Sequence, residues 1–517
     1  FSTCAVILLT IGATFGSVGL LGKVLNQMVI TYPLLIITLA LADCVHLFAI
    51  YFQERNKGET SKESMIKSLE LNLQPLFLTT VTTCIGFLSF NALDVEPLRD
   101  LGNGISLGVL FAFIYTIFFI APLISFLDVK IPTSTQQQVN LSRKLAIFSL
   151  SSGKTFLWTI PLICSLLILL IPLNKLEMNP TQMYSEKYTS FGPDVLWLDK
   201  KLGASFPISF KATSDNGSVS NPRFLEDLDN FSIWLEEQKE VTHVTSLART
   251  MKSLNKSMHG DDLKMKVIPE DQELSSQYLF FYEMSLPMGL DLNTSISQDR
   301  GSTRIAATLR EMTSKEYLIF DEKVAEYLRE NNLESIISKP AGFRVIFVYL
   351  MEAIVNSLLV GVTIGLALII TVIGFFFRSA SFGFLSSFPN ILPIVSAFGI
   401  WAIIDGQIDF MVAVGMGSTL GIIVDFTVHL LSKYDLARQE LKKSPEDAVL
   451  FAFEAVGFAL IAMTIILALG FSVLHLVSFL PMHNFAQFSI LAFVFALIID
   501  FFLFPNLLVR FDKRKFD

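Results

Sequence analysis

Two aspartates lie deep inside separate apolar stretches of this chain, and each is followed within about one helical turn by a histidine. Asp43 and His46 are three residues apart and Asp425 and His429 are four apart, so each pair shares one face of a helix. A carboxylate near the centre of a bilayer costs roughly 2.5 to 3.5 kcal/mol on insertion scales, so two of them in matching contexts imply a use. Because such acids can take and release protons as their neighbours move, these residues predict a proton relay. The alternative is a static Asp–His hydrogen bond that locks helices together.

A third intramembrane acid and a set of hydroxyls extend the candidate relay. Asp500 lies in the apolar run FALIIDFFLFPNLL, near one end of the last span, where we expect partial solvation. Two interpretations of Asp500 stay open, a relay member and a packing or capping residue. Five threonines, Thr79, Thr80, Thr82, Thr83 and Thr464, lie on the runs that follow the two aspartate runs. Their hydroxyls either bond the carboxylates across a helix interface or bond their own helix backbone.

Glycines recur in the same apolar runs, where small residues at helical spacing let another helix approach closely. The glycines that we expect at helix contacts are Gly86, Gly417, Gly421 and Gly470, and the first run holds a further row at Gly12, Gly16 and Gly19.

The composition places these residues in a membrane protein. Of the residues, 52% are hydrophobic and only 17% are charged, and the mean hydropathy is +0.56. The net charge of -8 gives no indication of nucleic-acid binding. A phosphate-binding glycine loop, a Ser–His–Asp set and a metal-ligand spacing are all missing from the sequence. We therefore expect no enzyme, no metal and no bound cofactor, and a proton gradient as the energy source.

Ten apolar runs are long enough to cross a bilayer as helices. They lie near 1–22, 27–53, 71–92, 98–128, 155–173, 346–377, 382–404, 408–433, 447–477 and 484–510. The polar stretch 174–345 between the fifth and sixth runs is long enough for a folded domain. Strand patterns such as SFPISFKATS and VTHVTSL alternate with helix patterns, one of which opens at Asn221-Pro222, so a small α/β domain is predicted.

Basic residues predict the orientation of the chain, because Lys and Arg accumulate in cytoplasmic loops. They fall on one side of a ten-span threading: Arg55, Lys57, Lys62, Lys67, Lys130, Arg143, Lys144, Lys154, Arg438, Lys442, Lys443, Lys513, Arg514 and Lys515. We therefore expect residues 174–345 outside the cytoplasm. Residues 129–154 are basic and mildly amphipathic, and we expect them on the cytoplasmic membrane surface.

An internal repeat relates the two halves of the chain. At an offset of 384, Thr80 falls on Thr464 and Gly86 on Gly470; at 382 to 383, Asp43 falls on Asp425 and Pro122 on Pro505. Two halves of one transporter-like fold are predicted. Because the first half then lacks its beginning, we expect one or two spans and a first outside domain to precede Phe1.

The string SFPNILPIVSAFGIWAIIDGQIDFMVAVGMGSTLGIIVDFTVHLLSKY and the matching LALADCVHLFAIYFQERNKG resemble the resistance-nodulation-division (RND) superfamily, in its MMPL-type and sterol-sensing-domain-like exporter branch. The resemblance implies a fold of twelve spans with two outside porter domains. It also implies that proton influx drives the transport of hydrophobic or amphiphilic cargo, often lipids. Proton-relay roles carry over to Asp43 and Asp425. Many relatives have a second acid or a tyrosine directly after the aspartate, where this chain has Cys44 and Phe426, and His46 and His429 are candidates for the missing partner.

The expected fold is an α-helical polytopic membrane protein with a pseudo-twofold repeat of helical bundles and an α/β (ferredoxin-like) extracytoplasmic porter domain. The expected domains are a first-half bundle at 1–128, a linker at 129–154, a transmembrane helix at 155–173, the porter domain at 174–345 and a second-half bundle at 346–517.

The expected function is proton-driven export of hydrophobic or lipid-like molecules at the cytoplasmic (inner) membrane of a bacterium. Membrane lipids are expected partners, with a homo-oligomer or an accessory periplasmic protein as further possibilities. Two alternatives stay open. One is a sterol-sensor-like lipid receptor without net transport, and the other is an auxiliary of protein secretion with the same fold.

Overall fold

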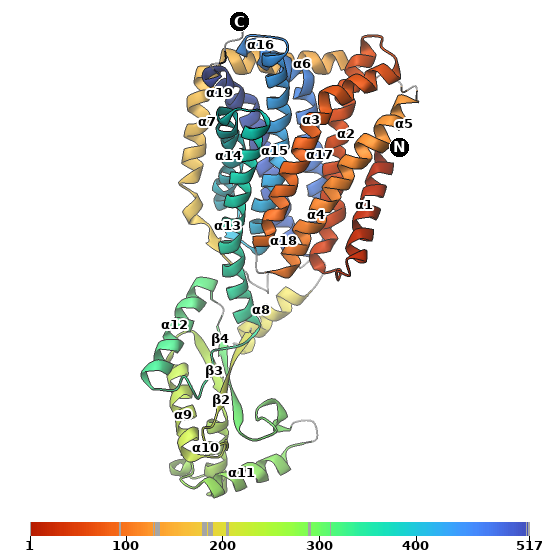
Figure 1. Cartoon of the computed structure of the whole chain (residues 1–517). Coiled ribbons are helices and arrows are strands. Elements are labelled where there is room, and N and C mark those ends of the chain that lie inside the picture. Colours follow the sequence, from red (N-terminus) through yellow and green to blue (C-terminus); the bar gives the residue numbers. More distant parts are fainter. Residues whose placement is uncertain are drawn as a thin grey trace. The chain divides into compact units, whose positions relative to one another are not determined.

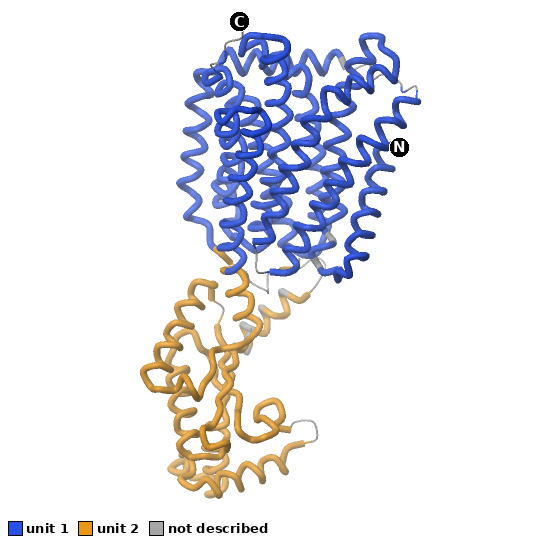
Figure 2. Tube along the Cα trace, in the orientation of Figure 1, with its two compact units in different colours: residues 1–175, 353–517 blue, residues 176–352 orange. Residues whose placement is uncertain are grey.

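The structure, a computed structural model, describes residues 2–92, 95–127, 129, 135–177, 183–184, 190–202, 206–287, 291–310, 312–512 and 514. It divides into two compact units, the first formed by 1–175 with 353–517 and the second by 176–352 (Figure 2). Phe1 and three of the basic residues used for orientation, Lys130, Lys513 and Lys515, lie outside the described residues.

The first unit is a helical bundle. Its elements before the second unit are α1 (Ser2–Leu20), η1 (Gln27–Thr31), α2 (Tyr32–Asn56), α3 (Ser61–Leu88), η2 (Ser89–Ala92), α4 (Glu96–Tyr115), η3 (Thr116–Ile120), α5 (Ala121–Ser125), α6 (Thr135–Ser151), α7 (Gly153–Ile168) and η4 (Ile171–Leu173). Those after it are α13 (Phe343–Phe376), α14 (Ala380–Ile404), α15 (Phe410–Gln439), α16 (Pro445–Ala452), η8 (Phe453–Gly457), α17 (Phe458–Ser472), η9 (Val473–Leu476), α18 (Leu480–Ile498), η10 (Ile499–Leu503) and α19 (Phe504–Phe511). The part of the chain that the structure describes holds ten helices long and apolar enough to span a membrane, which confirms the ten predicted spans.

Helix α15 is the most enclosed span of the bundle. Its apolar stretch is 100% buried, and helices α3, α14, α16 and α18 pack against it (Figure 1). A helix that is apolar all round is stable only where protein covers every face. Asp409 starts α15 by accepting hydrogen bonds from the backbone N–H groups of Met411 and Val412, which lack partners within the helix.

Breaks in helical regularity recur at the spacing of the sequence repeat. The 3-10 turn η2 follows α3 and the 3-10 turn η9 follows α17, and their first residues are 384 positions apart. The π-helical turns η3 and η10 each precede a proline, and their first residues are 383 positions apart. A π turn arises where one extra residue is inserted into an α-helix, and such turns are rare. Their occurrence at equivalent positions of the two halves is therefore stronger evidence for a repeat than helices of similar length.

The second unit contains a three-stranded antiparallel sheet. Strands β2 (Phe206–Thr213), β3 (Val241–Thr245) and β4 (Ser302–Leu309) pair in the order β2-β4-β3. Phe206 lies opposite Leu309 in the β2–β4 pair, and isolated bridges join Ser209 to Ala341 and Ala212 to Ile337 on the other edge of β2. The helices of this unit are α8 (Phe191–Leu202), α9 (Pro222–Glu237), α10 (Leu247–Met258), α11 (Gln272–Ser285) and α12 (Ser314–Glu330), with the 3-10 turns η6 (Leu263–Met265) and η7 (Leu292–Thr294).

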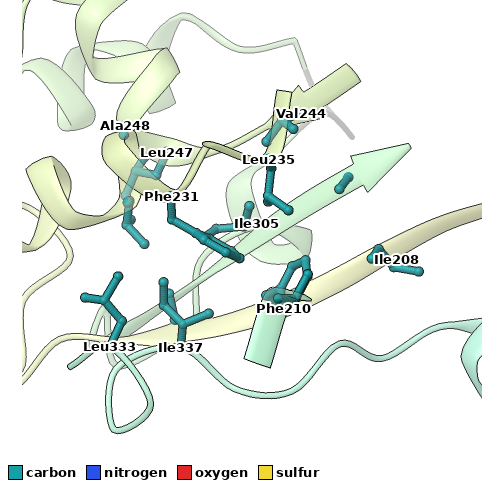
Figure 3. Packing of buried hydrophobic residues seen from close by; sticks show 14 of the residues in the cluster. Ile208, Phe210, Phe231, Leu235, Val244, Leu247, Ala248, Ile305, Leu333 and Ile337 are labelled. Atoms are coloured by element: carbon teal, nitrogen blue, oxygen red, sulfur yellow. The ribbon is translucent and has the colours of Figure 1, made fainter. Parts of the chain in front are cut away.

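Helix α9 packs on the sheet through an apolar core. Asn221 caps α9 at the predicted position, accepting a hydrogen bond from the Phe224 N–H. Phe210 of β2 meets Phe231 of α9 edge to face, with ring centroids 5.2 Å apart (Figure 3). The same core includes Val345 and Val348 at the start of α13. Because these two side chains pack on the α/β core, the second unit extends to residue 352, beyond the expected boundary at 345.

Candidate functional site

Helices α2 and α15 bring the two predicted Asp–His pairs to one buried place in the bundle. The imidazole rings of His46 and His429 stack face to face, with centroids 3.5 Å apart and planes 5° from parallel. Both histidines are 1% exposed. Asp43 and Asp425 each precede the histidine of their own helix by about one turn. Residues from the two ends of the sequence therefore form one site.

The stacked histidines are not locked by hydrogen bonds. Among the described residues, Nδ1 and Nε2 of His46 and Nδ1 of His429 have no hydrogen-bond partner. The static Asp43–His46 bond that the sequence left open is therefore not what the structure has. Unsatisfied buried nitrogens are costly and mark a site where a proton or a water can be handled.

A lysine that the sequence reasoning missed lies beside the histidine pair. Lys433 is 1% exposed, and its ammonium donates a hydrogen bond to the backbone carbonyl of Leu71. It is four residues beyond His429, which is four beyond Asp425, so acid, imidazole and amine follow one face of α15. Each step rises about 6 Å along the helix. This spacing of four was the signal in the sequence that could have found Lys433.

Helix α3 supports Asp425 at its closest approach to α15. The hydroxyl of Thr83 donates to the Gly421 carbonyl at 2.8 Å and to Asp425 Oδ1 at 3.2 Å. A Cβ on Gly86 would lie 2.7 Å from the Cα of Gly421, so the two backbones touch at this crossing. A side chain on Gly417 would meet the Phe90 ring at 2.3 Å. The glycines thus set the distance at which Thr83 reaches the carboxylate.

The other predicted hydroxyls bond within their own helices. Thr79 and Thr80 donate to the Leu76 carbonyl, and Thr464 donates to the Leu460 carbonyl. Of the two alternatives for these threonines, the structure has the bond to the helix backbone. Among the predicted hydroxyls on α3, Thr83 faces α15, and it is the one that bonds a carboxylate across the helix interface.

Asp500 is fully buried, which corrects the expected partial solvation. Its side chain is 0% exposed, and its Oδ1 accepts a hydrogen bond from the Thr427 hydroxyl at 3.1 Å. The expectation was wrong because the π turn η10 directs Asp500 toward α15 instead of toward the helix end. In the first half, Cys44, at the position equivalent to Thr427, makes a comparable contact with Thr116 at the start of η3, with sulfur and oxygen 3.9 Å apart.

A buried acid also marks the end of α15 outside the span. Burial raises the pKa of Asp409 to about 6, although hydrogen bonds from Val412, Asn484 and Met411 favour its charged form. The amide of Asn484 donates to Asp409 at 2.8 Å. A second buried acid thus lies on the same helix as Asp425, at its first turn.

A metal site is not part of this arrangement. Within the described ranges, no group of three or more His, Cys, Asp or Glu side chains is placed to hold a metal ion. Among the described residues, the buried ionisable groups around α15 instead include three acids (Asp43, Asp425 and Asp500), two imidazoles and an amine. Such a set can bind, hold and pass on protons.

A bundle of ten apolar helices with this polar site defines a multi-pass membrane protein. The crystal structure of SecDF in its super-membrane-facing form is similar in fold over 99% of this chain and 58% of that chain, with a TM-score of 0.55 and 11% identity. The chain belongs to the MMPL family, whose model matches residues 215–515. A second model, the Patched sterol-sensing domain, matches residues 1–126. These matches confirm the predicted family.

A membrane protein of Methanocaldococcus jannaschii is 29% identical to this chain over 154 residues, which are 29% of this chain and 39% of that protein. The chain therefore spans less than two thirds of the length of either of these similar proteins.

Proposed function

We propose that this protein is a proton-driven RND-type transporter of hydrophobic or lipid-like molecules in the cytoplasmic membrane. The observation that carries the proposal is the stacked His46–His429 pair beside two buried aspartates, contributed by two helices from distant parts of the sequence. A site assembled this way changes whenever α2 and α15 move relative to each other. Proton binding at the site is therefore coupled to helix movement.

The proposed coupling follows from the contact between the rings. Two imidazolium ions 3.5 Å apart would repel strongly in a low-dielectric interior, so the stacked pair accepts a proton on one ring at most. Transfer of a proton from Asp43 or Asp425 to a ring nitrogen places a positive charge beside the Lys433 ammonium. Repulsion then favours separation of α2 from α15, and loss of the proton favours the stacked state.

The path is proposed to run along α15 from Asp425 through the histidines to Lys433. The basic residues near Lys433, including Arg438 at the end of α15, support a cytoplasmic location for this end. Asp500 is proposed as a side branch, because its hydroxyl partner Thr427 lies between Asp425 and His429 in the sequence. A proton gradient supplies the energy, and no bound cofactor is needed.

The finer architecture is also a proposal. The recurrence of η2 as η9 and of η3 as η10 supports two pseudo-twofold halves. The pairing order β2-β4-β3, with residues 337–341 bridged to the outer edge of β2, supports a ferredoxin-like porter domain. Because the chain spans 58% of SecDF, the complete transporter, its oligomeric state and any accessory protein belong to this proposal.

The proposal is tested in proteoliposomes that contain a pH-sensitive dye in the lumen and a fluorescent phospholipid analogue in the membrane. Asp43→Asn and Asp425→Asn are expected to abolish proton influx and gradient-driven lipid movement while the protein stays folded. Asp405→Asn is the matched control, because Asp405 is exposed at the end of α14 and lies outside the site.

Three outcomes separate the functions. Loss of proton influx and of lipid movement in Asp43→Asn and Asp425→Asn, with both retained in Asp405→Asn, supports the transporter. Binding of the lipid analogue with no response to a collapsed proton gradient supports a sensor instead. Proton influx without lipid movement contradicts the assigned cargo and favours an auxiliary function of the same fold.

A further inference from the structure

Helix α15 packs tightly on α3 along much of its length. The Gly86–Gly421 crossing brings the two backbones together, and the hydroxyl of Thr83 bonds α15 one turn further along. Beyond that, Lys433 donates to the Leu71 carbonyl. At this interface, side chains of the site fill the space between the helices.

The contact between α2 and α17, which the sequence repeat makes equivalent, is held differently. At the crossing, a Cβ on Gly470 would lie 2.8 Å from Cγ2 of Thr38, so a side chain lies where the other interface has a glycine backbone. At the far end, Gln53 donates from Nε2 to the carbonyls of Glu454 and Ala455 at 3.2 and 3.3 Å. Those carbonyls belong to the π turn η8. A close methyl contact therefore holds one end of this interface, and hydrogen bonds from Gln53 hold the other.

A cavity of about 240 Å³ lies between α2 and α17 and extends to Gln53 and Glu454 at this far end. Apolar side chains line most of it, among them Val45, Phe48 and Ala49 of α2 and Ala462 of α17. These residues are part of two membrane-spanning helices, and all four are only half-buried. The medium around such helices is lipid, so an apolar opening between them is filled by an acyl chain in preference to water.

The polar end of the cavity carries a charged pair under the basic helix α6. Arg143 Nε lies 3.4 Å from Glu454 Oε1, and 61% of the Arg143 side chain is exposed. Helix α6 is held close to η8, because a Cβ on Gly457 would come within 3.1 Å of Ser142. Lys144 follows on the exposed side of α6. Arginine and lysine here match a phosphate group in charge, and the guanidinium offers several N–H donors.

We propose that the α2–α17 cavity is a binding site for one acyl chain of an anionic membrane phospholipid, whose phosphate lies against Arg143. The apolar walls accept the chain, and the Glu454 carboxylate fixes the guanidinium at the mouth. The site deepens the proposed function by giving it a lipid-binding position, but it does not depend on proton transfer, because lipid binding is measured without a gradient.

The experiment uses the full chain in nanodiscs of phosphatidylethanolamine and phosphatidylglycerol, with a trace of phosphatidylglycerol that carries a diazirine on one acyl chain. After illumination, labelled peptides are mapped by mass spectrometry. Labelling is expected to be stronger on residues 45–53 and 455–462 than on the exposed face of α13 at Leu359, which serves as the reference for nonspecific labelling. Equal labelling of α13 and of the cavity helices would overturn the proposal.

Two substitutions sharpen the test. Ala462→Trp fills the cavity and is expected to lower labelling there roughly tenfold, as expected when about two methylenes are displaced. Ile465→Trp is the matched control, because Ile465 is 54% exposed on the same helix. An equal loss in both variants contradicts a specific site. Arg143→Gln is expected to reduce labelling by the phosphatidylglycerol probe and to leave labelling by a diazirine diacylglycerol unchanged; equal loss with both probes contradicts the phosphate contact.

Discussion

The imidazole rings of His46 and His429 lie parallel with centroids 3.5 Å apart, although 383 positions separate the residues in the sequence. Stacking of two neutral rings is favourable, whereas stacking of two charged rings is not. The contact therefore depends on the number of protons at the site. This dependence is the physical basis of the coupling that we propose.

Replacing either histidine by phenylalanine tests whether protonation, as opposed to packing, is the function of the pair. His46→Phe and His429→Phe keep an aromatic ring in the stack, so we expect the free energy of unfolding to change by less than about 1.5 kcal/mol. Proton influx in proteoliposomes should be lost, because phenylalanine has no nitrogen. His475→Phe, in the turn η9 away from the site, is the control and should transport normally. Normal proton influx in both site variants would show that the stack is structural.

Lys433→Met tests the amine beside the pair. Methionine has a similar length and a flexible apolar side chain, so the bundle should fold. We expect slow proton influx and a pH dependence of influx that differs from the wild type, because the charge that opposes ring protonation has been removed. Lys433→Arg keeps the charge and should restore part of the activity. Wild-type influx at every pH in Lys433→Met would remove the lysine from the path.

The sequence predicted the spans well, because spans depend on local composition. Ten apolar runs became ten helices, and Asn221 caps the helix that its side chain predicts. The cost of an unpaired charge in lipid singles out Asp43 and Asp425 without any knowledge of the fold.

Contacts across helices were less predictable. Spacing along one helix suggested that His46 faces Asp43, but it could not show that His46 stacks on His429. Which threonine bonds Asp425 depends on the rotation of α3 about its axis, and Thr83 was favoured over Thr80 by the crossing at Gly86. These relationships arise from tertiary packing, and a single sequence contains little information about it.

The glycine crossing gives a prediction about stability. Gly86→Ala would place a Cβ 2.7 Å from the Gly421 Cα, and neither backbone can move aside without separating α3 from α15. We expect a loss of about 1 to 3 kcal/mol in stability. Unfolding can be followed with a thiol-reactive dye, because Cys44, Cys84 and Cys164 are buried, once the exposed Cys4 is replaced by Ser.

The matched control for this prediction is Gly12→Ala in α1. A Cβ at Gly12 meets nothing within 4 Å, so no loss of stability is expected there. Equal melting temperatures for Gly86→Ala and the wild type would contradict the close backbone contact.

The hydrogen bonds that Tyr434, Arg438 and Arg514 donate to Asp512, here called the Asp512 clamp, give a prediction about how stability depends on pH. The Asp512 carboxylate, 1% exposed, accepts these hydrogen bonds at 2.9 to 3.0 Å. Burial alone would raise the pKa of Asp512, but the bonds from the two arginines bring it down to about 2. An aspartate in an unfolded chain titrates near 3.9, so the folded state favours the ionised form. The carboxylate therefore contributes stability above about pH 4, and this contribution is lost as the pH falls toward 2.

We expect Asp512→Asn to lower the free energy of unfolding by about 2 kcal/mol at neutral pH. The difference from the wild type should shrink between about pH 4 and pH 2, because the wild-type carboxyl becomes neutral there. Dye-monitored melting of both proteins over this range measures the difference directly. Glu446→Gln, at an exposed position in α16, should match the wild type throughout. If the difference in the free energy of unfolding between Asp512→Asn and the wild type stays constant from neutral to acid pH, the ionised carboxylate is not the source of the stability, and the prediction is contradicted.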